Sequence, residues 1–187
     1  KKKFIYLISP NKIYKKFFKD LQKVLETGKI SFFQLRLKKY SFKHKILIGQ
    51  KIKNICKKNK VKFLINDDPI LAKRLGADGC HLGQKDMNIK EARKIIHKQI
   101  IGVTCHNSLN LAKIAIKAKA SYLAFGSFYT SKTKKTKYGA NIKILNKIKK
   151  FTNIPIVAIG GINSKNYKNL LLNNANFLAI SGYIWNN

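Results

Sequence analysis

Carboxylates are scarce in this chain. Its 187 residues include only 7 Asp and Glu against 40 Lys and Arg, which gives a formal net charge of +33. Such a charge favours polyanionic partners, so nucleic acid and anionic membrane surfaces must be weighed. The lysines, however, are spread over every helix-like segment and are not gathered into one tract with aromatic residues between them. We therefore interpret them as solvated faces and expect no specific nucleic-acid partner.

Cysteines are few, and long apolar runs are absent. Cys56, Cys80 and Cys105 form neither a metal-binding spacing nor an even set for disulfides, which favours a reducing, cytoplasmic location. The apolar part of KKKFIYLISP is too short for a signal peptide or a membrane span. No Pro-, Gly- or Ser-rich stretch divides the chain. We therefore expect a single domain, residues 1–187, that is cytoplasmic and does not bind membranes.

Eight short apolar segments recur along the chain, and helix-like patterns separate them. Strands that alternate with helices pair in parallel through right-handed crossovers, and eight such units close naturally into a (β/α)8 TIM barrel. The alternative is an open, doubly wound sheet. Only YIWNN follows the last segment, so we expect a compact barrel whose eighth helix is short or absent. The expected strands are 4–9, 32–37, 62–66, 79–83, 100–105, 122–128, 155–160 and 177–182.

Two apolar stripes at helical spacing support this alternation. The first has its residues at i, i+3, i+4 and i+7, and the second is shorter. Both predict helices with one face packed against the barrel. The stripes are Leu111, Ile114, Ala115 and Ala118, followed by Ile144, Leu145 and Ile148.

The carboxyl ends of the expected strands are polar, and in a TIM barrel the chemistry lies at that end. Asp67 and Asp86 follow the third and fourth strands, so they belong to neighbouring strand ends. Mg²⁺ commonly takes one or two protein carboxylates and leaves its other positions to water and substrate phosphate. The pair is therefore predicted to hold Mg²⁺ against a diphosphate. The alternative is local: Asp67 or Asp68 caps the helix that Pro69 begins, and Asp86 stabilises a turn.

Basic residues at the same strand ends would complement phosphate oxygens. Arg36 and Lys38 stand two positions apart on the second expected strand, and Lys134 lies in the loop after the sixth. Arginine is rare here, so Arg36, flanked by Gln34 and Lys38, is the stronger candidate for a bidentate phosphate contact. Any one of these cations could equally belong to a solvated face.

Other strand-end motifs have two interpretations each. The turns AIGGI (158–162) and ISG (180–182) offer backbone amides where barrels commonly hold a phosphate, but tight turns use the same glycines. SKTKK (131–135) adds hydroxyls and cations. His81 and His106 could act as bases or could satisfy local hydrogen bonds.

Taken together, these motifs resemble the thiamine phosphate synthase family, which also includes the thiazole tautomerases. The resemblance covers about residues 4–184. It implies a TIM-barrel transferase that, with Mg²⁺, joins hydroxymethylpyrimidine diphosphate to a thiazole phosphate and releases thiamine phosphate and pyrophosphate. The motifs that carry it are QLRLK (34–38), ND (66–67), LGADGCHLGQKD (75–86), GVTCH (102–106), GSFYTSKTK (126–134), AIGGI (158–162) and AISG (179–182).

The resemblance also implies roles for individual residues. Asp67 and Asp86 would be the metal ligands, and the catalytic groups would be Arg36, Lys38, Lys134 and Thr104. The pyrimidine diphosphate site would comprise Gln34, Arg36, Lys38, Asn66, Thr104 and Lys134. The thiazole phosphate site would comprise Ser131, Thr133, Gly161, Ile180 and Ser181.

Four positions depart from the family's pattern. Thr104 stands where serine is commoner, and Ser131 stands where threonine is usual, so both keep a hydroxyl. Ser127 replaces a frequent proline. Asp68 replaces a frequent arginine, and it is either a third carboxylate near the metal or a local cap.

Two rival functions are open at this point. A thiazole tautomerase of the same fold would use an acid–base residue such as His106, and it would not need two metal carboxylates. A basic, non-catalytic nucleic-acid-binding barrel would use the lysines instead. Asp67 and Asp86 favour the synthase, whose partners would be small-molecule substrates; the sequence leaves homo-oligomer formation open.

Overall fold

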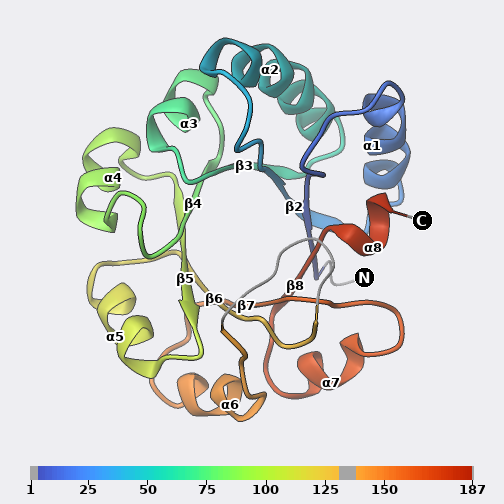
Figure 1. The fold of residues 1–187 in the computed structure, drawn as a ribbon. Coiled ribbons are helices and arrows are strands. Elements are labelled where there is room, and N and C mark those ends of the chain that lie inside the picture. Colours follow the sequence, from blue (N-terminus) through green and yellow to red (C-terminus); the bar gives the residue numbers. More distant parts are fainter. Residues whose placement is uncertain (1–3, 131–137, 187) are drawn as a thin grey trace.

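Eight parallel strands form a closed barrel in a computed structural model that describes residues 4–130 and 138–186 (Figure 1). Each strand pairs with its successor along the chain, and β8 pairs with β1 to close the ring. The expected TIM barrel is confirmed and the open sheet is excluded. The strands are β1 (Ile5–Ile8), β2 (Ile30–Leu35), β3 (Lys62–Asn66), β4 (Gly79–Leu82), β5 (Ile100–His106), β6 (Tyr122–Gly126), β7 (Ile156–Ile159) and β8 (Phe177–Ile180).

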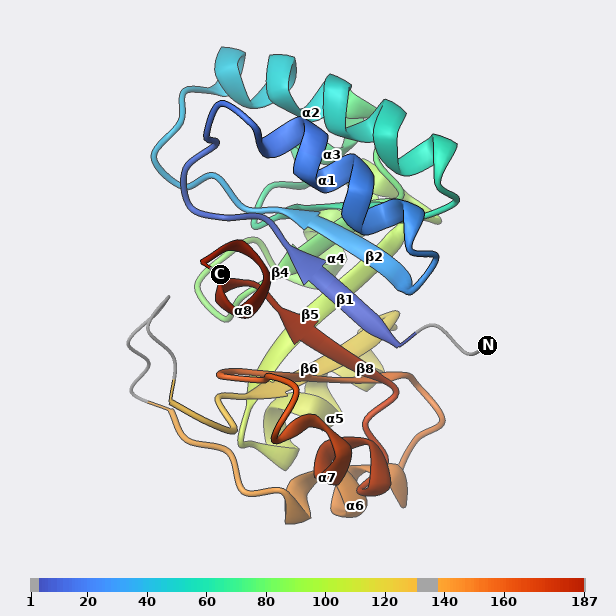
Figure 2. The same ribbon diagram turned by 90° about the vertical axis from the view of Figure 1, so that its right-hand side faces the viewer.

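The helices surround the barrel, as Figure 1 shows. None of those in the described part of the chain is long and apolar enough to cross a membrane. The eighth helix is short, as expected, with four residues, and lies at the end toward which β1 and β8 point (Figure 2). The helices are α1 (Phe17–Glu26), α2 (Phe42–Lys58), α3 (Pro69–Leu75), α4 (Ile89–Ile96), α5 (Leu109–Lys117), α6 (Lys143–Lys149), α7 (Tyr167–Leu172) and α8 (Gly182–Trp185).

Short polar residues begin three consecutive helices just after strand-end loops. Asp68, Asn88 and Ser108 each accept a hydrogen bond from the backbone N–H three residues ahead, which satisfies one of the free donors of α3, α4 and α5. Because each cap fixes where its helix starts, it also fixes the length of the loop that follows β3, β4 or β5. Those loops carry the polar strand ends.

The core has two layers, because successive strand residues face opposite sides. On β3, Phe63 and Ile65 pack outward against the helices, whereas Leu64 faces the interior of the barrel. The interior cluster also contains the aromatic side chains of Tyr6 and Tyr122. The inside of the barrel is therefore a packed core that includes two hydroxyl groups.

The second strand is displaced from its expected position. It spans Ile30–Leu35, not 32–37, so Arg36 and Lys38 lie in the loop beyond it and not on one strand face. The strand starts early because Ile30 pairs with Ile5 of β1. It ends early because the Arg36 backbone N–H donates to the Ser9 hydroxyl at 2.9 Å and not to a strand carbonyl.

One member of the first helical stripe was predicted wrongly, whereas Ala115 is buried and Leu111 and Ala118 pack against the core. Ile114 is 64% exposed, and the buried face of α5 consists of Ala112 and Ala115. The stripe of Ile144, Leu145 and Ile148 on α6 is buried as predicted.

Candidate active site

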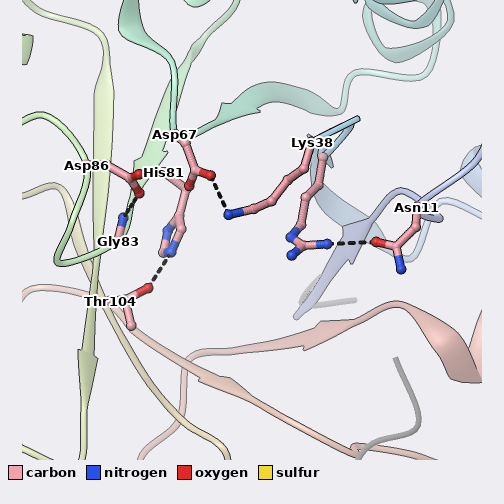
Figure 3. Close-up of polar contacts among 8 residues, drawn as sticks. Asn11, Lys38, Asp67, His81, Gly83, Asp86 and Thr104 are labelled. Atoms are coloured by element: carbon pink, nitrogen blue, oxygen red, sulfur yellow. Dashed lines mark hydrogen bonds and ion pairs between the residues drawn. The ribbon is translucent and has the colours of Figure 1, made fainter. Parts of the chain in front are cut away.

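The structure brings Asp67 and Asp86 together at the carboxyl ends of β3 and β4. Asp67 follows β3 with a left-handed backbone (φ +66°), a conformation that Asp tolerates better than most residues. Asp86 closes the loop after β4, because its Oδ2 accepts the Gly83 N–H at 2.7 Å. The two side chains lie near each other (Figure 3), and each shifts the pKa of the other. Two ionised carboxylates this close repel, so the pair needs a proton or a cation.

The two carboxyl groups have pKa values shifted in opposite directions. Burial raises the pKa of Asp67, but the hydrogen bonds from Lys38 and Asp86, with the nearby positive charge, outweigh it and lower the pKa overall. Burial and the bond to Asp67 raise the pKa of Asp86, against the opposing effect of the Gly83 N–H. Of the two groups, Asp86 therefore takes up a proton more readily, and Asp67 is the more strongly acidic.

Lys38 forms an ion pair with Asp67, Nζ to Oδ2, at 2.9 Å. In Figure 3 its side chain reaches from the loop after β2 toward the carboxylate pair. Arg36, from the same loop, is directed elsewhere: its Nη1 donates to Asn11 Oδ1 at 2.7 Å. The sequence did not single out Asn11, because an exposed loop asparagine carries no pattern.

The carboxylate pair lines a pocket of about 470 Å³. Four predicted residues, Lys38, Asn66, Asp67 and Asp86, contribute to its wall, and Lys45 of α2 joins them. Lys45 was missed because lysines are common in this chain. Only its position in the first turn of α2 distinguishes it. The remaining lining residues are Leu35, Leu37, Ile65, Asp68, Pro69, Leu71 and Met87.

The donor set of this pocket fits Mg²⁺. Within residues 4–130 and 138–186, no three His, Cys, Asp or Glu side chains gather into a metal cage. Two hard carboxylates beside an open pocket suit an ion that keeps water or substrate phosphate at its other positions. Asp68 lines the same pocket, and its Oδ1 accepts the Leu71 N–H at 2.9 Å, so it acts as the local cap of α3.

A chain of hydrogen bonds crosses the barrel interior. Gln34 Nε2 donates to the Tyr6 hydroxyl at 2.6 Å, and the hydroxyls of Tyr6 and Tyr122 are 2.7 Å apart. His81 then bridges Tyr122 and Thr104: its Nδ1 lies 2.8 Å from the Tyr122 hydroxyl, and its Nε2 lies 2.8 Å from Thr104 Oγ1. Burial raises the pKa of both tyrosines, so both hydroxyls keep their protons. Two predicted substrate residues, Gln34 and Thr104, are thereby linked.

Tyr6 and Tyr122 were not recognised from the sequence. A tyrosine within an apolar strand is consistent with ordinary core packing, and nothing in the pattern marks the hydroxyl. The available signal was their alternation on β1 and β6, which places both side chains inside the barrel.

The predicted second anion site is only partly described. Ser131, Thr133 and Lys134 lie outside the described residues. Gly161, after β7, has φ +59°, and a Cβ there would lie 2.2 Å from the Thr130 carbonyl oxygen, so glycine is required. Ser181, after β8, donates to the Ser9 carbonyl at 3.3 Å, next to the buried Ile180.

His106 is the last residue of β5. It has a left-handed backbone (φ +51°), and its ring stacks on that of Tyr138 with centroids 4.0 Å apart. The ring of His81 makes hydrogen bonds to side chains of two other strands, Tyr122 of β6 and Thr104 of β5.

Comparison with known proteins identifies the family. The family model described as thiamine monophosphate synthase matches residues 5–184. The chain belongs to the thiamine monophosphate synthase family. It is 68% identical to the thiamine-phosphate synthase of Pelagibacter ubique over its whole length and 90% of that relative. It is 40% identical to that of Erythrobacter litoralis, over 97% of this chain and 87% of the relative.

A solved structure agrees with the sequence relatives. Thiamine phosphate pyrophosphorylase from Pyrococcus furiosus superimposes with a TM-score of 0.86 and 29% identity, covering 97% of this chain and 86% of that one. The family resemblance, the barrel fold and the function as a thiamine phosphate synthase, a transferase of thiamine biosynthesis, are thereby confirmed. Its substrates are small molecules, and the comparisons favour neither the tautomerase nor the nucleic-acid-binding barrel.

Proposed function

We propose that this member of the thiamine monophosphate synthase family transfers the pyrimidine group of hydroxymethylpyrimidine diphosphate to a thiazole phosphate in a Mg²⁺-dependent reaction. Asp67 and Asp86 hold the ion. The observation that carries the proposal is the pair of neighbouring carboxyl groups, Asp67 and Asp86, which lines a pocket shared with Lys38 and Lys45. A pair of acids beside lysines in a chain with only 7 acids suits a metal–diphosphate site.

Breaking the pyrimidine C–O bond first leaves a carbocation and a pyrophosphate that carries extra negative charge. Bound Mg²⁺ supplies electrostatic stabilisation of that leaving group. The side chain of Lys38 is largely exposed and lies beside the pair. It donates to the oxygens of the leaving group. Arg36, at the rim and held by Asn11, adds a planar donor, and Lys134 is proposed as a further cation.

The rest of the reaction depends on positioning. Gln34, Asn66 and Thr104 hold the pyrimidine substrate at the mouth of the barrel. Ser131, Thr133, Gly161, Ile180 and Ser181 hold the phosphate of the second substrate at the ends of β6, β7 and β8. The thiazole nitrogen then attacks the cationic carbon, and holding both partners in place supplies much of the rate. No protein nucleophile takes part.

The setting of the enzyme is part of the proposal. Residues 1–187 act as one domain in the cytoplasm, without a specific nucleic-acid partner or a membrane. The three cysteines are buried and free, which is consistent with a reducing compartment.

The direct test is an assay with both substrates, in Mg²⁺ and in excess chelator. We expect thiamine phosphate and pyrophosphate in equal amounts, with Mg²⁺ and both substrates required. Full turnover in chelator would contradict the metal role.

Arg36→Ala extends this test, with Arg74→Ala, an exposed arginine on α3, as the matched control. Losing a donor to developing charge typically costs about 10²–10³ in rate. Normal turnover of a folded Arg36→Ala enzyme would remove Arg36 from the site.

A further inference from the structure

Tyr122 sits at the centre of the hydrogen-bond chain inside the barrel, and the neighbouring strand makes room for it. Gly102 of β5 pairs with Tyr122 of β6. A Cβ on Gly102 would lie 1.8 Å from the Tyr122 ring, so a side chain there would displace the ring. The ring also stacks on that of His81, with centroids 5.6 Å apart and planes at 15°. The fold thus holds the Tyr122 hydroxyl between Tyr6 and His81.

Counting protons gives this chain a direction. The Gln34 side-chain nitrogen can only donate, so the Tyr6 oxygen accepts its hydrogen. Tyr6 has one hydrogen of its own, and in the described part of the chain its hydroxyl has two partners, Gln34 and Tyr122. That hydrogen therefore goes to Tyr122.

The hydrogen bonds keep the same direction from Tyr122 to Thr104. Tyr122 accepts from Tyr6, so its own single hydrogen goes to His81 Nδ1. An Nδ1 that accepts must be unprotonated, which places the proton of the neutral imidazole on Nε2. Nε2–H then donates to Thr104 Oγ1.

The opposite direction leaves one buried hydrogen-bond donor without an acceptor. If His81 Nδ1–H donated to Tyr122, Tyr122 would donate to Tyr6, whose oxygen would then accept twice. The hydrogen of Tyr6 would be left without an acceptor among its two described partners, on a residue that is 1% exposed. An unsatisfied buried donor is unfavourable, so the first direction is preferred.

We propose that Tyr122 is a positioning residue: its hydroxyl fixes His81 as the Nε2–H tautomer, and this leaves the Thr104 hydroxyl hydrogen to donate to an acceptor atom of the pyrimidine substrate. Thr104 is otherwise fixed through its backbone carbonyl, which accepts from the Gln84 side chain. The identity of the acceptor rests on the proposed function. The tautomer of His81 does not.

The first experiment reads the tautomer directly, by nitrogen NMR of ¹⁵N-histidine protein. The chain has four histidines, so His81→Gln identifies the His81 signals. We expect the neutral imidazole of wild-type His81 to show an unprotonated Nδ1 and a protonated Nε2. An Nδ1–H tautomer in the wild type would overturn the proposal, whether or not the enzyme assay succeeds.

Tyr122→Phe and Tyr6→Phe form a matched pair for the same measurement. Each removes one buried hydroxyl and keeps a ring, but only Tyr122→Phe removes the donor to His81. We expect His81 to lose its single tautomer in Tyr122→Phe and to keep it in Tyr6→Phe. An unchanged His81 spectrum in folded Tyr122→Phe would refute the role of Tyr122. The wild-type spectrum remains a test if that variant does not fold.

Steady-state kinetics of single and double variants test whether Tyr122 acts through Thr104. We expect Tyr122→Phe to lower kcat/KM for the pyrimidine substrate by up to about tenfold, the equivalent of one ordinary hydrogen bond. Thr104→Val should cost at least as much, and the double variant should be no worse than Thr104→Val alone. Additive losses would show that Tyr122 has a separate, merely structural effect.

Discussion

Two ion pairs of the same chemistry lie at opposite ends of the barrel. Lys62 and Asp78 join at 2.8 Å before β4, and Lys38 and Asp67 join at 2.9 Å after β3. Their side chains have similar exposure, 60% and 33% against 56% and 27%. The second oxygen of Asp78 accepts the Phe63 backbone N–H at 2.9 Å, whereas Asp67 faces the carboxyl group of Asp86. The first pair is complete within the chain, and the second needs a further proton or cation.

This difference separates structural acids from functional ones. Asp78 bridges the start of β3 through Lys62 and Phe63, so its interactions are used in folding. Asp67 stands in a left-handed backbone conformation, and its charge raises the pKa of its neighbour Asp86, so the pair carries backbone strain and carboxylate repulsion. Acids placed at such a cost, in a chain that has few, are expected to serve binding.

The largest effect that would separate the two pairs comes from removing their acids. Asp67→Asn should lower turnover by about 10²–10³ at ordinary Mg²⁺ concentrations. The variant would bind Mg²⁺ more weakly, so the charge on the leaving pyrophosphate would be less well neutralised. Asp78→Asn should keep near-normal turnover per folded molecule and lose about 1 kcal/mol of unfolding free energy. Steady-state rates and urea unfolding of both variants provide the check. Equal turnover in the two variants would show that Asp67 and Asp78 do not differ in function.

The cations of the two pairs should differ in the same sense, with a smaller effect. Lys38→Ala removes a donor to the leaving group, so we expect turnover to fall by about 10- to 100-fold, the value of one hydrogen bond to a charged group. Lys62→Ala removes a surface ion pair, which is worth about 1 kcal/mol or less. Turnover rates at saturating substrate test this expectation. A larger loss of turnover in Lys62→Ala than in Lys38→Ala would contradict it.

The smallest effect concerns stability without metal. Because the folded-state pKa of Asp86 is raised, its stabilising contribution is present below its unfolded pKa and is lost as pH rises through the folded value. At neutral pH in chelator, Asp86→Asn should therefore melt at an equal or slightly higher temperature than the wild type. The advantage should vanish in acid, where wild-type Asp86 is protonated. Glu91→Gln, an exposed acid on α4, is the control for loss of one charge. A lower melting temperature at neutral pH would indicate that Asp86 serves mainly the turn.

Much of the architecture could be predicted because apolar alternation is a local signal. Each of the eight strands overlaps its expected segment, and β3 matches it completely. The edges were harder to predict, because they depend on partners distant in the chain. The end of β2 is set by the hydroxyl of Ser9, and the buried residues of α5 are Ala112 and Ala115, not Ile114.

The candidate site was predictable where residue types were rare. Asp67 and Asp86 stood out among few acids, and the structure brings them together, although their metal role remains a prediction. Lys45 was hidden among many lysines. Tyr6 and Tyr122 meet across the barrel from positions 116 residues apart, and no pattern along the chain reveals that contact.

The Mg²⁺ activation curve of Asp86→Asn tests the account most directly. Asparagine keeps the side-chain volume and an oxygen that can accept the Gly83 N–H, but it removes one of the two charges proposed to hold the ion. We expect half-maximal activity of Asp86→Asn to require far more Mg²⁺ than that of the wild type, while Glu91→Gln is unchanged. An activation curve that coincides with the wild-type curve would contradict the assignment of Asp67 and Asp86 as the magnesium site.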